Sequence, residues 1–259
     1  MLALLLVALV AWNSRRDANH SRPDSPARTD QPPASSFPEE AANPDAEIAS
    51  SRQVDFDFYL LAMTLHPAFC ADGHARKREC QVTETVPLSI HRLWPERTQP
   101  GAYPRDCQGP RLQLDDHLLA QLQPLMPGIG AGLHVHEWNK HGRCSNLLAD
   151  EYFQYTLLLA RRLDAALRDE LTTSAGQALS TRELRAAADR HEAGLGESLT
   201  FHCRTLRDAP PQHRQQPFLI EIRQCFDNDG EAGAPGTRLR CADMNRRDQG
   251  CGRTFRIAP

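Results

Sequence analysis

The folded part of the chain shows two hydrophobic periods, one typical of strands and one typical of helices. A compact apolar run from Asp55 to Leu65, which ends just before Pro67, predicts a buried central strand. The segment PLSIHRLWP, residues 87–95, predicts a second strand bounded by prolines. From Leu114 to Gly128, leucines recur at helical spacing until proline and glycine interrupt them, which predicts a helix.

The second half of the chain predicts helices followed by strands. The segment from Asp150 to Leu171 carries a long apolar stripe at helical spacing, with Asp150 as its candidate N-cap. The sequence STRE, residues 180–183, has the form of a capping box that opens another helix. Runs at 198–203, 217–226 and 237–241 then predict strands. The sum predicts an α+β domain in which helices cover an antiparallel sheet.

The N-terminal region differs in composition from the rest. Residues 1–12, MLALLLVALVAW, are too few to span a bilayer, which takes ~20 residues, and they look like the apolar core of a secretory signal peptide. No clear cleavage site follows, so an uncleaved anchor stays an alternative to cleavage. Residues 13–52 are crowded with Pro, Ser, Ala and charge, which predicts a disordered linker. We expect one folded domain at 53–259, in a periplasmic or secreted protein.

All eight cysteines lie inside this expected domain, between Cys70 and Cys251. An even number in an exported protein favours disulfides over free thiols. No CxxC pair is present, which argues against a zinc knuckle. We therefore expect four stabilising disulfides, and spacing alone leaves their pairing open.

The formal net charge is −3 at pH 7, so the protein does not bind nucleic acids through a high overall positive charge. Any contact with RNA has to be local. An enzyme that binds one or two phosphates needs only a small basic cluster. The charge therefore argues against a tight binding module more than against a nuclease.

The densest cluster of reactive groups is HVHEWNKHGRC, residues 134–144. If this segment is helical, His136 lies four residues from Lys140, and Glu137 lies four residues from His141, which places all four side chains on one face. Such a set can bind an anion and hold imidazoles that exchange protons near neutral pH. The plainer alternative is a solvated polar face, which four converging ionisable groups make less favoured.

The sequence HEW also opens the zinc-protease motif HExxH. That motif places its second ligand four residues after the first histidine, where this chain has Lys140. His141 lies five residues from His136 and points elsewhere on a helix. A zinc metalloprotease is therefore an unfavoured alternative, and we expect neither a metal nor another cofactor.

Two segments together resemble the active-site segments of the ribonuclease T2 family. LSIHRLWPER, residues 88–97, is similar to the family's usual IHGLWP, and HEWNKHGRC, residues 136–144, is similar to its HEWxKHGTC. The similarity extends from about Phe58 to the last cysteines and is strongest to bacterial periplasmic members. It implies a ribonuclease T2-like fold and a metal-independent endoribonuclease.

The resemblance implies a role for each matching residue. His91 would be the general acid and His141 the general base. Three neighbours, His136, Glu137 and Lys140, would hold the phosphate and the charge it gains. The implied base-binding residues are Trp94, Glu96 and Tyr103.

These roles imply cleavage of single-stranded RNA with little base specificity. One imidazole would take the proton of the ribose 2′-hydroxyl and the other would protonate the departing 5′-oxygen, which leaves a 2′,3′-cyclic phosphate. DNA lacks this hydroxyl, so we expect no DNA cleavage. We expect a monomer that binds RNA and has no stable membrane association after processing. The alternative is an inactive RNA-binding or toxin module, which the complete set of catalytic positions disfavours.

The resemblance also implies a disulfide pairing. One implied bridge would join the end of the catalytic helix to the loop after His91. The implied pairs are Cys70–Cys80, Cys107–Cys144, Cys203–Cys251 and Cys225–Cys241.

Arg92 is the one clear departure from the family pattern, which usually has glycine there. On a regular strand its side chain points away from His91, toward solvent or an acidic partner. The alternative is that the strand twists as it approaches Pro95 and lets the guanidinium reach a neighbouring phosphate of a longer RNA. Histidines outside the two motifs are expected to be surface or structural residues.

Overall fold

The computed structural model describes residues 54–81, 86–99 and 101–259. The predicted signal-like segment at 1–12 and the linker at 13–52 lie outside these residues. Within the described part of the chain, no helix is long and apolar enough to cross a membrane.

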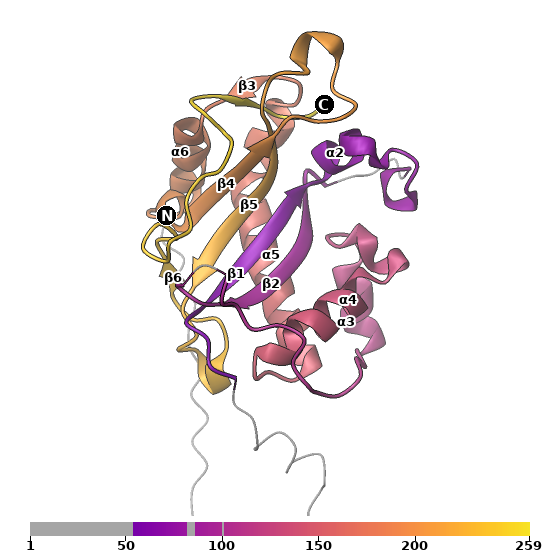
Figure 1. Ribbon diagram of the computed structural model, residues 1–259, viewed down its shortest axis with the longest axis vertical. Helices are drawn as coiled ribbons and strands as arrows, with labels where there is room; N and C mark the ends of the chain where they lie inside the picture. The colour runs from indigo at the N-terminus through magenta and orange to yellow at the C-terminus, as the bar shows by residue number, and fades with distance from the viewer. Residues whose placement is uncertain (1–53, 82–85, 100) are drawn as a thin grey trace, which may run out of the picture. The chain divides into compact units, whose positions relative to one another are not determined.

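Seven strands of the described chain form one sheet (Figure 1). The path of neighbouring strands is β2-β1-β5-β7-β3, and β4 and β6 each pair with β5 outside this path. Neighbours are antiparallel except for a short parallel contact between β5 and β7. The strands are β1 (Phe58–Leu65), β2 (Leu88–Glu96), β3 (Ala178–Leu179), β4 (Leu199–Arg204), β5 (Phe218–Phe226), β6 (Arg238–Leu239) and β7 (Phe255–Arg256).

The longer strands follow the sequence prediction to within about three residues, which is the usual uncertainty of element boundaries. Strands β3 and β7 were not predicted. Each has only two residues, too few to show an alternating pattern.

The helices confirm the expected α+β class. In Figure 1, α5 runs along one face of the sheet, behind β1, β2 and β5. Its buried residues, including Phe153 and Leu163, share one apolar core with Met63 of β1 and Ile222 of β5. The helices are α2 (His66–Phe69), α3 (Asp116–Leu122), α4 (Leu133–Lys140), α5 (Ala149–Thr173) and α6 (Thr181–His191).

Two predicted helix ends need correction. The helix expected at 114–128 is α3 alone, because the chain turns before Pro124 and resumes as a 3-10 helix at Pro127–Ala131. Proline has no N–H to continue the helical ladder. Asp150 is not the N-cap of α5: that position is Leu148, whose N–H donates to the Glu151 carboxylate at 3.0 Å. The capping box at Ser180 is confirmed.

A β-bulge interrupts the pairing of β1 with β2. Ala62 pairs with Arg92 and the next residue, Met63, pairs with Ile90, so His91 is the extra residue. A bulge breaks the alternation of side chains along a strand. The expectation that Arg92 points away from His91 was therefore wrong: Trp94 lies within reach of both side chains.

Four disulfides join the described part of the chain, and their pairs are the ones that the resemblance implies. The Cys107–Cys144 bridge spans 37 residues and ties the loop after β2 to the 3-10 turn Gly142–Cys144, directly after α4. It therefore fixes the two segments that carry His91 and His141 relative to each other. The pairs are Cys70–Cys80, Cys107–Cys144, Cys203–Cys251 and Cys225–Cys241.

Candidate active site

The face of the sheet that α5 leaves free carries charged side chains. Glu221 and Arg223 alternate along β5 with the core residue Ile222. Across β1 they register with Thr64 and Ala62. Because alternate residues of a strand share a face, these two charges lie on the side opposite α5.

His91 is held by a carboxylate from β5. Its Nδ1 lies 2.8 Å from Oε2 of Glu221, and the other oxygen of Glu221 accepts from Nε of Arg223. Burial alone would raise the pKa of Glu221, but the hydrogen bond from His91 and the charge of Arg223 outweigh it and lower this pKa to about 2. Glu221 is thus ionised at neutral pH and can only accept hydrogen bonds, so Nδ1 of His91 carries the proton.

The second motif forms α4, as the hypothesis of a helix requires. Glu137 and Trp138 face inward, and the Trp138 indole donates to the carbonyl of Pro110 at 3.2 Å. His136 lies on the outside, with 61% of its side chain exposed, and its Nε2 is 4.0 Å from Glu137. The four polar groups therefore do not share one environment.

His141 lies just beyond the helix. Its N–H donates to the carbonyl of Glu137 at 2.9 Å, but its backbone leaves the helical conformation at φ −129° and ψ −47°. The side chain turns inward and is 2% exposed. The helix end thus places an imidazole in the interior.

Trp94 brings the two histidines together. Its ring centroid lies 6.2 Å from that of His91 and 5.0 Å from that of His141. The two predicted catalytic histidines, 50 residues apart in sequence, therefore flank one side chain.

Charge and burial keep His141 neutral. Burial lowers its pKa to about 3, and the positive charges of Arg92, Lys140 and His136 act in the same direction. The ring is therefore neutral at neutral pH, the form in which an imidazole nitrogen has a free lone pair.

The predicted base-binding residues have different surroundings. Tyr103 stacks parallel to Trp94, with ring centroids 6.3 Å apart and an angle of 14°. Glu96 is buried, and its carboxylate accepts from Arg246 at 2.7 Å. Arg246 also donates to the carbonyl of Arg97 at 3.0 Å. The carboxylate of Glu96 is therefore already engaged by a protein partner.

Sequence reasoning missed four residues around the site. Glu221 and Arg223 lie next to His91, and Arg246 holds Glu96. His202, expected to be a surface or structural residue, pairs in register with Glu221, and burial together with Arg223 lowers its pKa to about 4. The available signal was charge in the strand PFLIEIRQCF, where Glu and Arg interrupt an apolar run.

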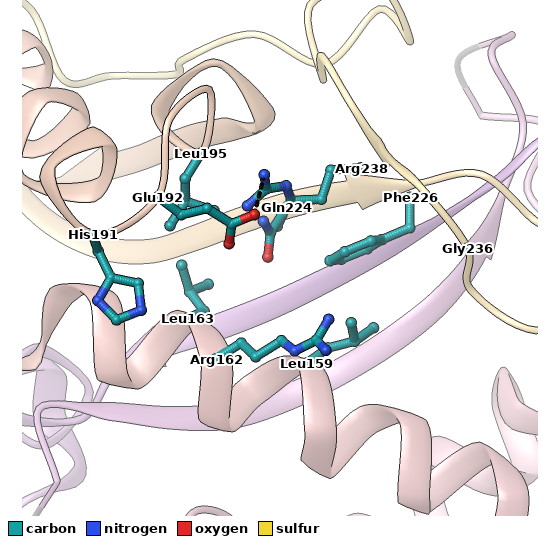
Figure 2. Close-up of a pocket in the computed structure, with 10 residues that line it drawn as sticks. All are labelled: Leu159, Arg162, Leu163, His191, Glu192, Leu195, Gln224, Phe226, Gly236 and Arg238. Carbon is teal, nitrogen blue, oxygen red and sulfur yellow. Dashed lines mark ion pairs between the residues drawn. The ribbon is translucent and has the colours of Figure 1, made fainter.

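A cavity of about 460 Å³ lies away from these residues (Figure 2). It is bounded by α5, the end of α6 and the β5–β6 edge, and Arg238 pairs there with Glu192 at 2.7 Å. None of the candidate catalytic residues lines it.

The described residues bring few possible metal ligands together. The one group of His, Cys, Asp and Glu side chains close enough to share an ion is His66, Cys70 and Cys80. Both sulfurs belong to one disulfide, so only His66 retains a ligand atom. This group does not fit a metal.

Comparison with known proteins identifies the fold. The model of the Ribonuclease T2 family matches residues 56–234. The chain belongs to the ribonuclease T2 family. A ribonuclease from Aeromonas hydrophila is 29% identical over 181 residues, which cover 68% of this chain and 74% of that protein. Ribonuclease I of Escherichia coli is 30% identical over 171 residues, covering 51% and 64%.

A solved structure supports the same assignment. A mutant of RNase MC1 in complex with 5′-UMP superposes with a TM-score of 0.60 and 26% identity, over 78% of this chain and 98% of that one. The ribonuclease T2 family match, the ribonuclease relatives and the shared fold identify the protein as a T2-type endoribonuclease.

Proposed function

We propose that this ribonuclease cleaves single-stranded RNA by transphosphorylation, with His141 as general base and His91 as general acid. The observation that carries the proposal is the placement of both imidazoles beside Trp94 in opposite electrostatic settings. His91 contacts the ionised carboxylate of Glu221, whereas His141 is buried among positive charges. One ring is suited to donate a proton and the other to accept one.

In the proposed reaction one histidine takes up a proton and the other gives one up. His141 takes the proton of the ribose 2′-hydroxyl while the 2′-oxygen forms a bond to phosphorus. The bond from phosphorus to the 5′-oxygen breaks, and that oxygen takes a proton from Nε2 of His91, the nitrogen that does not face Glu221. The product is a 2′,3′-cyclic phosphate, which water opens in a slower second step with the roles reversed. DNA lacks the nucleophile and is not cut.

Positive charge at the end of α4 would stabilise the phosphorane. The positive charges of Lys140 and His136 lower the pKa of His141, so a phosphate bound beside His141 would lie in their electrostatic field. Oε2 of Glu137 is buried without a hydrogen-bond partner, which leaves one acceptor for a protonated group of the bound complex. Fixed charges of this kind stabilise charge that develops in the transition state.

Stacking on Trp94 and Tyr103 would hold the base. Any base can stack on an aromatic ring, whereas reading one base requires unpaired donors and acceptors. Glu96 is occupied by Arg246, so it offers less for such reading. This arrangement supports cleavage with little base specificity.

We further propose a periplasmic or secreted monomer without stable membrane association after processing, whose catalytic domain spans 53–259. Four disulfides support an oxidising compartment. The segment at 1–12 would direct export and 13–52 would link it to the domain. Mass spectrometry of the mature N-terminus tests this part.

Product analysis tests the reaction itself. A dinucleoside monophosphate digested with excess EDTA should give a 2′,3′-cyclic nucleotide first and a 3′-nucleotide later. Loss of activity on chelation, restored by zinc, would contradict the proposal, and so would a 5′-phosphate product.

A further inference from the structure

Arg92 lies on the ring of Trp94, beside the proposed catalytic histidines. Its guanidinium carbon lies 3.0 Å from the ring centroid of Trp94, the side chain that both catalytic histidines flank. The bulge at His91 makes this position possible, because it brings consecutive side chains of β2 to the same aromatic ring. A guanidinium stacked on an aromatic ring has a restricted orientation.

The donors of Arg92 are largely unused. Its Nε is buried and has no hydrogen-bond partner. Among residues 54–81, 86–99 and 101–259, no carboxylate lies within 4.0 Å of the guanidinium. Three carboxylates act on its charge from beyond hydrogen-bond distance. Glu221 is bound by His91 and Arg223, and Glu96 is bound by Arg246, whereas Glu137 keeps one oxygen without a partner.

The charge of Arg92 nevertheless persists at neutral pH. Burial lowers its pKa to about 10, and the negative charges of Glu221, Glu137 and Glu96 oppose that shift. Arg92 is in turn the strongest of the positive charges that lower the pKa of His141. The cation therefore lies close to the proposed general base.

We propose that Arg92 is an additional catalytic residue, which binds the non-bridging oxygens of the scissile phosphate and stabilises the phosphorane. The inference rests on the proposed function and adds a residue to it. A partly buried guanidinium with free donors favours an anion that carries two oxygens in one plane. The bound phosphate would complete the hydrogen bonds that the protein leaves unmade, and the extra charge of the transition state would strengthen them.

This role differs from contact with a neighbouring phosphate. A side chain that reaches along the RNA would affect polymeric RNA and leave a dinucleoside monophosphate, which has one phosphate, unchanged. Arg92 instead stacks on Trp94, the ring that both histidines flank. Loss of Arg92 should therefore lower kcat even on a dinucleoside monophosphate.

The test compares Arg92→Gly with wild type on a dinucleoside monophosphate. We expect kcat to fall about 10²-fold, the size typical of losing one transition-state donor, with KM changed by less than about threefold. Millimolar guanidinium ion should restore part of kcat to Arg92→Gly, because the missing group is small and soluble. It should not restore His91→Ala. Arg214→Gly, which removes an exposed arginine, should retain full kcat.

Three results would overturn the inference. These are an unchanged kcat on the dinucleoside monophosphate, an effect confined to KM of polymeric RNA, or a loss of kcat with a lower Tm and no response to guanidinium ion. The proposed function fails separately, if wild-type enzyme forms no cyclic phosphate.

Discussion

The contact between His91 and Glu221 joins two strands that are not neighbours. Nδ1 of His91 lies 2.8 Å from the Glu221 carboxylate, and β1 runs between their strands β2 and β5. The bridge is possible because the bulge brings His91 onto the same face as Glu221. The sheet itself thus orients the proposed general acid.

Replacing Glu221 by Gln should slow the reaction. The amide keeps the shape but loses the negative charge that fixes the proton on Nδ1 of His91. We expect kcat to fall at least about 10- to 100-fold, the loss seen when the partner that orients a metal-binding histidine is removed. Glu197→Gln, which changes an exposed carboxylate, is the matched control. Equal kcat values for the two variants in steady-state assays would show that Glu221 has no part in orienting His91.

A change of leaving group should distinguish the role of His91 from that of His141. His91→Ala and His141→Ala should each lose about 10²- to 10⁴-fold in kcat on a dinucleoside monophosphate. A nucleoside 3′-(4-nitrophenyl phosphate) has a leaving group that departs without a proton, so His91→Ala should recover most of its activity on it. His141→Ala should remain slow because the 2′-hydroxyl still needs a base. The reverse pattern would exchange the two roles.

Local signals sufficed for much of the fold. The apolar stripe of α5 and the Ser180 capping box depend on neighbours within a few residues, and both were found in the sequence. The bulge at His91 depends on pairing with β1 and leaves no local trace. Glu221 lies 130 residues from His91, and Arg246 lies 150 residues from Glu96, so spacing could not connect them.

The motifs gave candidate catalytic positions but not their environments. A regular helix predicts one shared face for His136, Glu137, Lys140 and His141. The helix instead ends at Lys140, which turns His141 inward and leaves His136 outside. Helix ends are set by local backbone conformation and by packing around the next turn, and neither can be read from spacing.

Removing the Cys107–Cys144 bridge should impair catalysis as well as stability. This bridge connects the loop after β2 to the turn after His141, whereas Cys70–Cys80 lies outside the candidate site. Each double Cys→Ala variant should lose about 2–5 kcal/mol of unfolding free energy. At a temperature where both stay folded, the Cys107/Cys144 variant should show the larger loss of kcat. Equal kcat losses would show that the bridge does not position the histidines.

Acid should destabilise the enzyme through His202. Its pKa in the folded protein is about 4, below the ordinary 6.5, because the ring is buried and lies near Arg223. The unfolded chain therefore binds a proton first, and the contribution of His202 to stability is present above pH 6.5 and lost as pH falls toward 4. His202→Gln cannot take up this proton. The unfolding free energy of this variant should fall by about 1–2 kcal/mol less than that of wild type between pH 7 and 4.5. This figure allows for the partial exposure of the ring.

The control for His202 is an exposed histidine. His191→Gln should leave the pH dependence of unfolding as it is in the wild type, because that ring lies at the surface. Urea unfolding at several pH values measures both variants. Parallel curves for wild type and His202→Gln would rule out this source of acid sensitivity.

A methyl group at Gly142 should disturb the candidate site from its core side, where Trp138 and Tyr152 pack. Gly142 follows His141, and a Cβ there would lie 3.1 Å from Cζ3 of Trp138, with another ring carbon closer still, and 3.2 Å from Cε1 of Tyr152. Both rings are buried in the core, so neither can move away without opening a gap. Gly142→Ala should therefore shift the end of α4 and cost about 1–3 kcal/mol of unfolding free energy.

The same shift should also slow the reaction, because His141 directly precedes Gly142 and its placement depends on the turn that Gly142 begins. We expect kcat on a dinucleoside monophosphate to fall about 10- to 100-fold, since small misplacement of a catalytic group has effects of this size. Gly130→Ala is the matched control, because a Cβ there meets no atom within 4 Å. Thermal unfolding and kcat are measured on both variants. If Gly142→Ala lost stability but kept full kcat, the turn would support the fold without positioning His141.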